Sequence, residues 1–181
     1  DAAEDPLAPE LAQQAAPADP DRPVTDFGPA AEFVKRPWTG DLDGMVERRM
    51  IRLLVPYSKT HFFIDGGTPR GIAYEAGKKF ENEHNTSLAT RHLRVRVVFV
   101  PQQRDQLIPA LLEGRGDGVL AGLTVTPERS ARVAFGPPQQ QNANEMVVTG
   151  PEGPAISTVD DLSGKEVFVR RSSSYYESLQ A

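Results

Sequence analysis

Three apolar stretches alternate with two amphipathic ones between residues 50 and 122, and this alternation constrains the fold more than any other feature. Residues 50–55, 93–100 and 117–122 predict strands, whereas residues 71–83 and 103–113 predict helices. Strand, helix, strand, helix, strand in this order predicts a parallel sheet built from right-handed crossovers. Because ligands on such sheets bind beyond the carboxyl ends of the strands, the loops after the first and third strands are candidate site segments.

Apolar residues at helical spacing mark one face of each predicted helix. They are Ile72, Ala76 and Phe80 in the first helix, and Leu107, Leu111 and Leu112 in the second. We expect the three leucines to face the core. A shorter helix, capped by Asp43 and running through Arg49, is predicted before the first strand.

The first 41 residues differ in composition from the rest of the chain. They are rich in Pro, Ala and Asp and lack a sustained apolar period, which predicts a flexible leader. Trp38 adjoins the first structured element and is the leader's best candidate to dock on the folded body. Residues 1–43 carry ten acids and three bases, a charge of −7, and the remainder carries fifteen acids and seventeen bases, a charge of +2. Because residues 44–181 are close to neutral, they lack the strongly basic surface that general nucleic-acid binding requires.

After the leader at 1–41, we divide the chain into a first lobe at 42–138 and a hinge with the start of a second lobe at 139–181. Residues 145–149 and 165–169 have strand-like patterns, and a helix is expected to begin near Tyr175. Ser157 to Asp160 forms a capping-box pattern before the second of these strands. Since no further strand and helix pairs follow, the predicted fold is α/β with one full lobe and an incomplete second α/β lobe.

Residues 121–129, Ala-Gly-Leu-Thr-Val-Thr-Pro-Glu-Arg, end the third predicted strand and open a helix. Thr126 is a good N-cap, and the proline after it suits the first helical position because its missing N–H is harmless there. Gly122 lets a ligand approach the backbone, Thr124 offers a hydroxyl, and Arg129 lies in the first helical turn. Free amides, a hydroxyl and a guanidinium beside a helix N-terminus suit a carboxylate ligand.

Two further segments are expected near this motif. The loop after residue 55 contains several aromatic residues, and Tyr57 or Phe63 is expected to cover the apolar part of a ligand. A second strand-to-helix turn carries a cation and three hydroxyls, at Arg171, Ser172, Ser173 and Ser174. These serines are equally suited to capping the helix and to contacting a ligand, and the two roles are compatible.

Arg129 has a second interpretation that does not involve a ligand. An arginine near a helix start commonly pairs with a surface acid, and Glu128, Asp117 or another surface acid is a candidate in this sequence. The combination of Gly122, Thr124 and a capped turn at the end of a strand favours the ligand-binding interpretation.

These motifs resemble those of the amino-acid-type periplasmic solute-binding proteins, whose type II periplasmic-binding fold has two α/β lobes that close on a ligand. The similarity covers residues 45–179 and is most specific at 121–129. The resemblance implies contacts to the ligand's α-carboxylate from the backbone of Gly122, the hydroxyl of Thr124 and the guanidinium of Arg129. It also implies that the hydroxyls of 172–174 supply the second lobe's first ligand contacts.

Residues 53–59, 104–116 and 169–179 resemble, more narrowly, the binding-protein-like module of F-type membrane-bound lytic murein transglycosylases. In those proteins the module precedes a peptidoglycan-cleaving domain. The resemblance implies an extracytoplasmic module that recognises an amino acid or a peptide-like, muropeptide-like carboxylate and regulates a downstream catalytic domain.

In one further possibility the incomplete second lobe leaves the cleft open and the chain binds no ligand tightly. Two alternative functions also stay open. One is the substrate-binding component of an ABC amino-acid importer, with a permease as partner. The other is a type II binding-fold enzyme such as a dehydratase, which needs an acid/base residue in the cleft. The sequence singles out no such residue, so binding rather than turnover is expected of this chain.

Neither a metal nor another cofactor is expected. The chain has no cysteine, and His61, His84 and His92 lack metal-ligand spacing. No apolar run approaches the roughly 20 residues that cross a bilayer. Because the sequence starts at Asp1 without a methionine, we expect a processed product located in the periplasm or elsewhere outside the cytoplasm. Any association with a membrane would then come from a segment outside this sequence.

Overall fold

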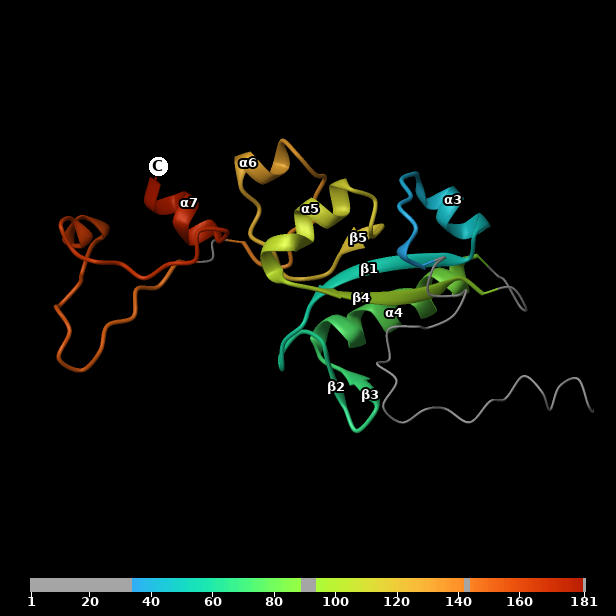
Figure 1. The fold of residues 1–181 in the computed structure, drawn as a ribbon, viewed down its shortest axis with the longest axis horizontal. Helices are drawn as coiled ribbons and strands as arrows, with labels where there is room; N and C mark the ends of the chain where they lie inside the picture. The colour runs from blue at the N-terminus through green and yellow to red at the C-terminus, as the bar shows by residue number, and fades with distance from the viewer. Residues whose placement is uncertain (1–33, 89–93, 142–143, 181) are drawn as a thin grey trace, which may run out of the picture. The chain divides into compact units, whose positions relative to one another are not determined.

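The computed structural model describes residues 34–88, 94–141 and 144–180. The predicted leader lies almost wholly outside these ranges, and the domain boundaries drawn after residues 41 and 138 stay predictions. The compact unit that contains the sheet begins at Pro37. Its elements (Figure 1) are α3 (Leu42–Glu47), β1 (Met50–Pro56), β2 (Phe63–Asp65), β3 (Thr68–Arg70), α4 (Ile72–Ser87), β4 (Arg96–Gln102), η1 (Arg104–Gln106), α5 (Leu107–Leu112), β5 (Gly118–Val119), α6 (Pro127–Ser130), η2 (Val159–Leu162) and α7 (Ser174–Gln180).

Three strands form a parallel sheet in the order β4-β1-β5. Leu53 of the central strand lies opposite Phe99 of β4 and Gly118 of β5. Helix α4 leads from β1 towards β4 and α5 leads from β4 to β5, and Figure 1 shows these helices on opposite faces of the sheet. The predicted parallel sheet with flanking helices is therefore confirmed, although β5 is shorter than the expected strand.

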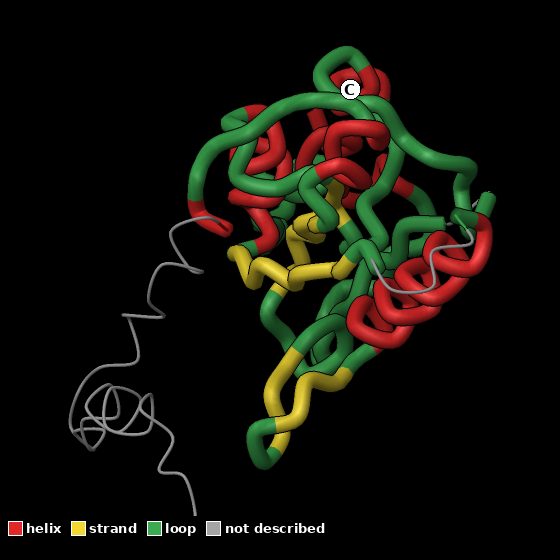
Figure 2. Tube along the Cα trace, turned by 90° about the vertical axis from the view of Figure 1, so that its right-hand side faces the viewer, coloured by secondary structure: helices red, strands yellow, loops and turns green. Residues whose placement is uncertain are grey.

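The segment between β1 and α4 forms a small antiparallel hairpin of β2 and β3. Both views show this hairpin extending away from the parallel sheet (Figures 1 and 2). Strands β2 and β3 contain no buried core residue, whereas Phe62, directly before β2, is buried and packs with Val55 and Ala73.

Strand β1 is buried on both faces, as expected for the centre of a parallel sheet. Leu54 is fully buried and packs with Leu107 and Ala110 of α5. The next residue, Val55, is also fully buried and packs with Ala73 of α4 on the other face. The near-continuous apolar run of β1 follows from this two-sided burial.

One detail is wrong in each of the predicted helices α3 and α5. Helix α3 begins at Leu42 with Asp41 at its N-cap position, so Asp43 lies inside the helix and does not cap it. In α5, Leu112 is exposed and Ala110 is buried instead. The stripe that faces the sheet starts at Leu107 and continues three and four residues later, and Leu112 lies outside that stripe.

Helix α4 buries a face that apolar periodicity did not predict. The buried residues are Ala73, Gly77, Glu81 and Asn85. The face shared by Ile72, Ala76 and Phe80 is exposed. Gly77 permits the close approach of helix and sheet, because a Cβ there would lie 2.5 Å from Cε1 of Phe99.

The two polar residues of this face act as hydrogen-bonding partners for the edge strand β4. Asn85 Nδ2 donates to the Val95 carbonyl at 2.9 Å, and the Val95 N–H donates to Asn85 Oδ1 at 2.8 Å. Glu81 Oε2 accepts the Val97 N–H at 2.7 Å. Because an edge strand leaves backbone groups without a strand partner, these side chains satisfy groups that would otherwise be buried and unpaired.

A buried ion-pair network fixes the start of β5. Asp117, immediately before that strand, accepts hydrogen bonds from Arg52 Nη2 at 2.8 Å and from the Arg52 N–H at 2.7 Å, and it also pairs with Arg48. Arg52 also donates to the carbonyls of Trp38 and Gly114. The Arg48 guanidinium lies 3.7 Å from the centre of the Trp38 ring. Trp38 therefore docks on the folded body, as predicted.

The predicted strands at 145–149 and 165–169 are absent, and the described residues 144–180 contain no strand. A strand needs a neighbouring backbone to pair with, and neither segment has one here. Their apolar side chains are accordingly exposed, Met146 by 83% and Phe168 by 88%. The capping box is present one residue later than predicted, between Thr158 and Asp161 at the start of η2.

Candidate functional site

The loop after β5 is held at both ends. The Leu120 N–H donates to the Leu54 carbonyl at 2.9 Å. At the other end, Thr126 Oγ1 accepts the Arg129 N–H at 3.3 Å, so Thr126 is the N-cap of α6, as predicted. Between them Gly122 has a φ of +54°, in the left-handed region that favours glycine. This backbone geometry turns the chain from the end of the sheet into α6.

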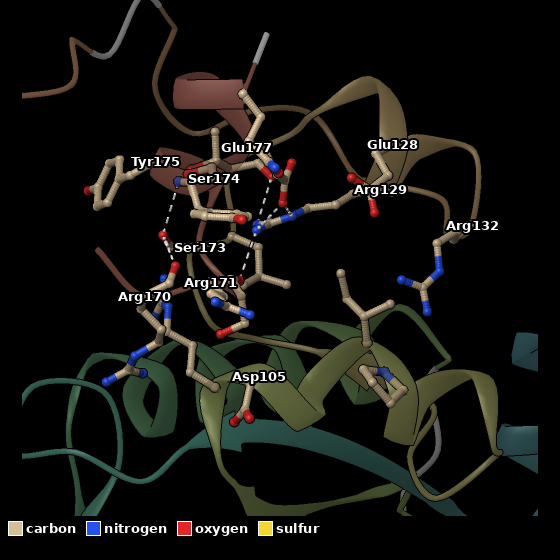
Figure 3. Close-up of a pocket in the computed structure, with 18 of the residues that line it drawn as sticks. Asp105, Glu128, Arg129, Arg132, Arg170, Arg171, Ser173, Ser174, Tyr175 and Glu177 are labelled. Atoms are coloured by element: carbon tan, nitrogen blue, oxygen red, sulfur yellow. Dashed lines mark hydrogen bonds and ion pairs between the residues drawn. The ribbon is translucent and has the colours of Figure 1, made fainter. Parts of the chain in front are cut away.

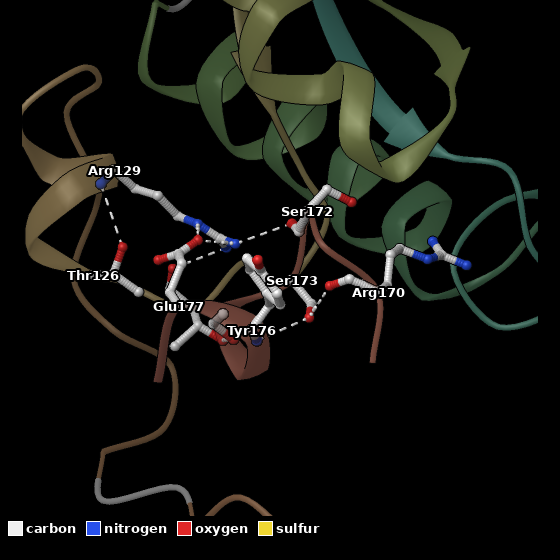
Figure 4. A network of polar contacts seen from close by, with 9 residues as sticks. Thr126, Arg129, Arg170, Ser172, Ser173, Tyr176 and Glu177 are labelled. Atoms are coloured by element: carbon white, nitrogen blue, oxygen red, sulfur yellow. Dashed lines mark hydrogen bonds and ion pairs between the residues drawn. The ribbon is translucent and has the colours of Figure 1, made fainter. Parts of the chain in front are cut away.

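Arg129 is buried and connects the loop to the segment that leads into α7. Its Nε and Nη2 atoms donate to Glu177 Oε1 at 3.0 and 2.8 Å. Nη2 also donates to the Ser172 carbonyl at 3.3 Å, and Nη1 donates to the Thr124 carbonyl at 3.4 Å. Figure 4 shows the guanidinium between Glu177 and Ser172. The structure thus shows the pairing of Arg129 with an acid that the second interpretation described, and the acid is Glu177 rather than Glu128 or Asp117.

The serine turn contacts the same loop through a second hydrogen bond. Ser174 Oγ donates to Thr124 Oγ1 at 3.0 Å, and Ser174 is buried. Ser173, immediately before α7, donates to the Arg170 carbonyl and accepts the Tyr176 N–H at 3.3 Å. Ser173 thus has the helix-capping role considered for the turn, and Ser174 points to the predicted site loop.

Like Arg104, Glu177 is a site residue that sequence reasoning missed. It lies in the first turn of α7, where a carboxylate is favourable. Burial alone would raise the pKa of the Glu177 carboxyl, but the Thr126 hydroxyl and the Arg129 guanidinium lower it, so the pKa is below its usual value. The only signal in the sequence was an acid in the first turn of a helix expected beside Arg129.

Two neighbouring cavities are present at this site. The first has a volume of about 560 Å³, within the range of small-molecule sites. Its lining includes seven residues predicted from the sequence: Gly122, Thr124, Arg129, Arg171, Ser172, Ser173 and Ser174. Figure 3 shows Arg129 and Glu177 directed toward each other, beside the segment that carries Arg170 and Arg171.

The predicted aromatic residues are placed differently from one another. Tyr57, 65% exposed, lines the second cavity, whose volume is about 570 Å³. Phe63 starts β2 and lines neither cavity. Phe62 is buried and stacks on Phe99 with ring centres 5.6 Å apart. Of these residues, Tyr57 alone stands where it could cover a ligand.

Arg104 is a further cation that both cavities share. Its Nη2 atom donates to the Gly122 carbonyl at 3.1 Å, which attaches η1 to the site loop. The nearby His61 has a pKa below its usual value because burial and the charge of Arg104 lower it more than the Ala121 backbone raises it. The neutral imidazole is thus favoured beside this arginine.

Among residues 34–88, 94–141 and 144–180, no group of three or more His, Cys, Asp or Glu side chains is arranged to hold a metal ion. In the same part of the chain, no helix is both long and apolar enough to span a membrane.

A parallel α/β sheet with a polar, arginine-containing cavity beyond its strand ends defines a small-molecule-binding module of the periplasmic-binding type. Residues 54–178 match the family model of the bacterial extracellular solute-binding proteins, family 3. The chain therefore belongs to this family, and its fold is that of a type II periplasmic-binding protein.

Individual proteins are also similar to parts of the chain. The ABC transporter arginine-binding protein 1 of Escherichia coli (strain K12) is 27% identical over 90 residues, which cover 50% of this chain and 36% of that protein. The membrane-bound lytic murein transglycosylase F of Maricaulis maris (strain MCS10) is 39% identical over 75 residues, which cover 41% of this chain and 16% of that protein. The chain thus spans well under half the length of these relatives.

Among solved structures, the ancestral amino acid-binding protein described as a precursor of cyclohexadienyl dehydratase is 33% identical, with a TM-score of 0.41. The match covers 49% of this chain and 36% of that one.

Proposed function

We propose that this chain is an extracytoplasmic solute-binding module whose ligand is an amino acid or a peptide-like carboxylate. One observation carries the proposal: a carboxylate, that of Glu177, already occupies Arg129. The guanidinium is therefore placed, oriented and sheltered from water in the way that a bound carboxylate requires. Membership of the extracellular solute-binding family supports the same conclusion.

In this proposal the ligand's carboxylate takes the place of Glu177 on Arg129. The Thr124 hydroxyl and the Gly122 backbone complete its hydrogen bonds, because both line the same cavity. Tyr57 covers the apolar part of the ligand from the second cavity. The turn from Arg171 to Ser174 lines the same cavity and contacts the ligand from the opposite side. A hinge motion would bring this turn closer to the bound ligand.

Replacing Arg129 with alanine tests the proposed carboxylate contact. A charge-assisted hydrogen bond contributes about 1.5 to 3 kcal/mol, so affinity for a bound amino acid should fall roughly tenfold to a hundredfold by calorimetry. Arg70→Ala is the control, because Arg70 is an exposed arginine of β3 that lines neither cavity. The double variant with Glu177→Ala avoids leaving that carboxylate unpaired. Unchanged affinity in both Arg129 variants would refute the assignment.

We further propose that the module regulates a peptidoglycan lytic transglycosylase and acts by binding rather than by turnover. The transglycosylase relative supports this role, and the ABC transporter relative supports the alternative of capturing solute for an importer permease. A strain lacking the protein distinguishes the two. Altered muropeptide release with normal amino-acid uptake supports the first role, whereas lost uptake with normal muropeptides supports the second.

The proposed location is the periplasm or another extracytoplasmic space, with any membrane attachment made outside this chain. The family to which the chain belongs is extracellular, which supports this placement. Osmotic-shock fractionation tests it, because recovery of the protein only with cytoplasmic markers would exclude the proposal.

A further inference from the structure

The first cavity carries more positive than negative charge. Five arginines and three acids line it: Arg104, Arg129, Arg132, Arg170 and Arg171, with Asp105, Glu128 and Glu177. Two positive charges therefore remain after every acid is counted against one arginine. A concave site with an excess of one charge raises the local concentration of ligands of the opposite sign.

Only some of the charged groups in the first cavity are neutralised by ion pairs. Arg129 and Glu177 neutralise each other directly, at 2.8 Å. Within the part of the chain that the structure describes, neither Asp105 nor Glu128 forms an ion pair. In the same part of the chain, no ion pair is formed by the other arginines that line the first cavity, which are Arg104, Arg132, Arg170 and Arg171. The guanidinium groups that remain are thus available to a bound anion.

The two cavities meet at a second cationic position. Arg104, Asp105, Arg170 and Ser172 line both cavities. Arg104 comes from η1 after β4, and its hydrogen bond to the Gly122 carbonyl fixes it beside the loop that leads to Arg129. Arg170 comes from the segment before α7. Two arginines from segments far apart in the sequence therefore flank this place together with Asp105, which leaves an excess of one positive charge, and Glu177 does not line the second cavity.

We propose that the ligand carries two acidic groups and so is net anionic, for example a dicarboxylic amino acid. One carboxylate replaces Glu177 on Arg129, and the second lies between Arg104 and Arg170 where the cavities meet. The proposal rests on the proposed function and specifies its substrate class. A cationic ligand, such as the arginine in the name of one relative, would add charge to a site that is already positive.

The experiment is calorimetric titration of the protein with acids and their neutral amides. L-Aspartate and L-glutamate are compared with L-asparagine and L-glutamine, and L-2-aminoadipate and L-arginine complete the panel. Each acid and amide pair has nearly the same shape, so their affinity ratio isolates the second negative charge. We expect at least one acid to bind tenfold or more tightly than its amide and than arginine.

Variants then place the second carboxylate. Arg104→Gln and Arg170→Gln should each reduce the acid-to-amide ratio by about tenfold. Arg70→Gln removes the same charge from the β2–β3 hairpin and should leave the ratio unchanged. An equal effect of all three variants would show a general charge effect and overturn the assigned position.

The outcomes separate this inference from the proposed function. If an amide or arginine binds as tightly as every acid, the anionic class is wrong while the solute-binding function stands. If no member of the panel binds, the inference fails, and the proposed function stands only for a peptide-like carboxylate ligand. A tenfold preference that is lost in Arg104→Gln and Arg170→Gln alone supports both.

Discussion

The ion pair between Arg52 and Asp117 gives the sharpest prediction about stability. Both side chains are 0% exposed, and Asp117 accepts hydrogen bonds from Arg52 and Arg48. Asp117→Asn keeps the shape of the side chain but removes its charge and places an amide N–H₂ against guanidinium donors. Arg52 is then left buried without its counter-charge.

The expected loss is large for a single substitution. Breaking a buried pair by removing one partner costs about 3 to 5 kcal/mol, a substantial part of the roughly 5 to 15 kcal/mol by which domains are stable. Asp65→Asn is the matched control, because Asp65 pairs with Arg70 at 3.2 Å with both side chains more than half exposed. Exposed pairs contribute about 0 to 1 kcal/mol, so the control should unfold almost as the unaltered protein does.

Urea unfolding measures both variants. The protein has one tryptophan, Trp38, and Arg48 of the network stacks on it, so its fluorescence reports directly on this region. Circular dichroism follows the rest of the fold in parallel. If Asp117→Asn lowers the free energy of unfolding no more than Asp65→Asn does, the network does not stabilise the fold as argued.

The pH dependence gives a second check on the same network. Burial alone would raise the pKa of Asp117, but hydrogen bonds from Arg52 and Arg48 hold it below its usual value. A carboxyl with a depressed pKa in the folded state stabilises the protein fully above its unfolded pKa of about 3.9. That contribution is lost as pH falls through the folded pKa. The stability difference between the unaltered protein and Asp117→Asn should therefore shrink on acidification below about pH 4.

Three further predictions concern the site. Glu177→Gln should raise the affinity for a carboxylate ligand about fivefold by calorimetry, because the ligand then displaces a neutral group from Arg129; equal or weaker binding would contradict the competition. Tyr57→Ala should weaken binding roughly threefold to tenfold and Phe63→Ala by less than twofold, and the reverse order would show that the wrong aromatic was assigned. Gly122→Ala should lower the free energy of unfolding by about 1 kcal/mol through its φ of +54°, and no change in denaturation would argue against that conformation.

The sheet could be predicted because the composition of its strand segments indicates strands. The run at β1 is apolar except for Arg52, and turn signals separate each strand from the next helix. The buried face of α4 could not be predicted in the same way. Apolar periodicity selected Ile72 and Phe80, whereas the sheet selects small or hydrogen-bonding side chains such as Gly77 and Asn85, because β4 is an edge strand.

The segments at 145–149 and 165–169 show that a strand-like composition does not suffice to form a strand. The apolar run of Met146, Val147 and Val148 favours a strand by composition, but a strand forms only beside another backbone. The pattern therefore describes a preference of the segment, and the pairing partner decides whether it is realised. The helix predicted near Tyr175 needed no such partner, since its hydrogen bonds are internal, and it is present as α7.

The convergence of Thr124 and Arg129 with the serine turn was implied by the resemblance to two-lobed binding proteins and not by topology, because the strand expected before that turn is absent. The role of these residues in binding a ligand stays a prediction. The role of Glu177 could not be predicted from the sequence, because it depends on a contact with Arg129 across 48 residues of sequence. That contact changes how an affinity for this site should be understood. A buried arginine without a counter-charge would be costly, so Glu177 stabilises the unliganded state. Binding is then an exchange of carboxylates on Arg129, and the measured affinity reports the ligand's advantage over Glu177. A second acidic group, held at Arg104 and Arg170, supplies such an advantage because Glu177 has no counterpart to it.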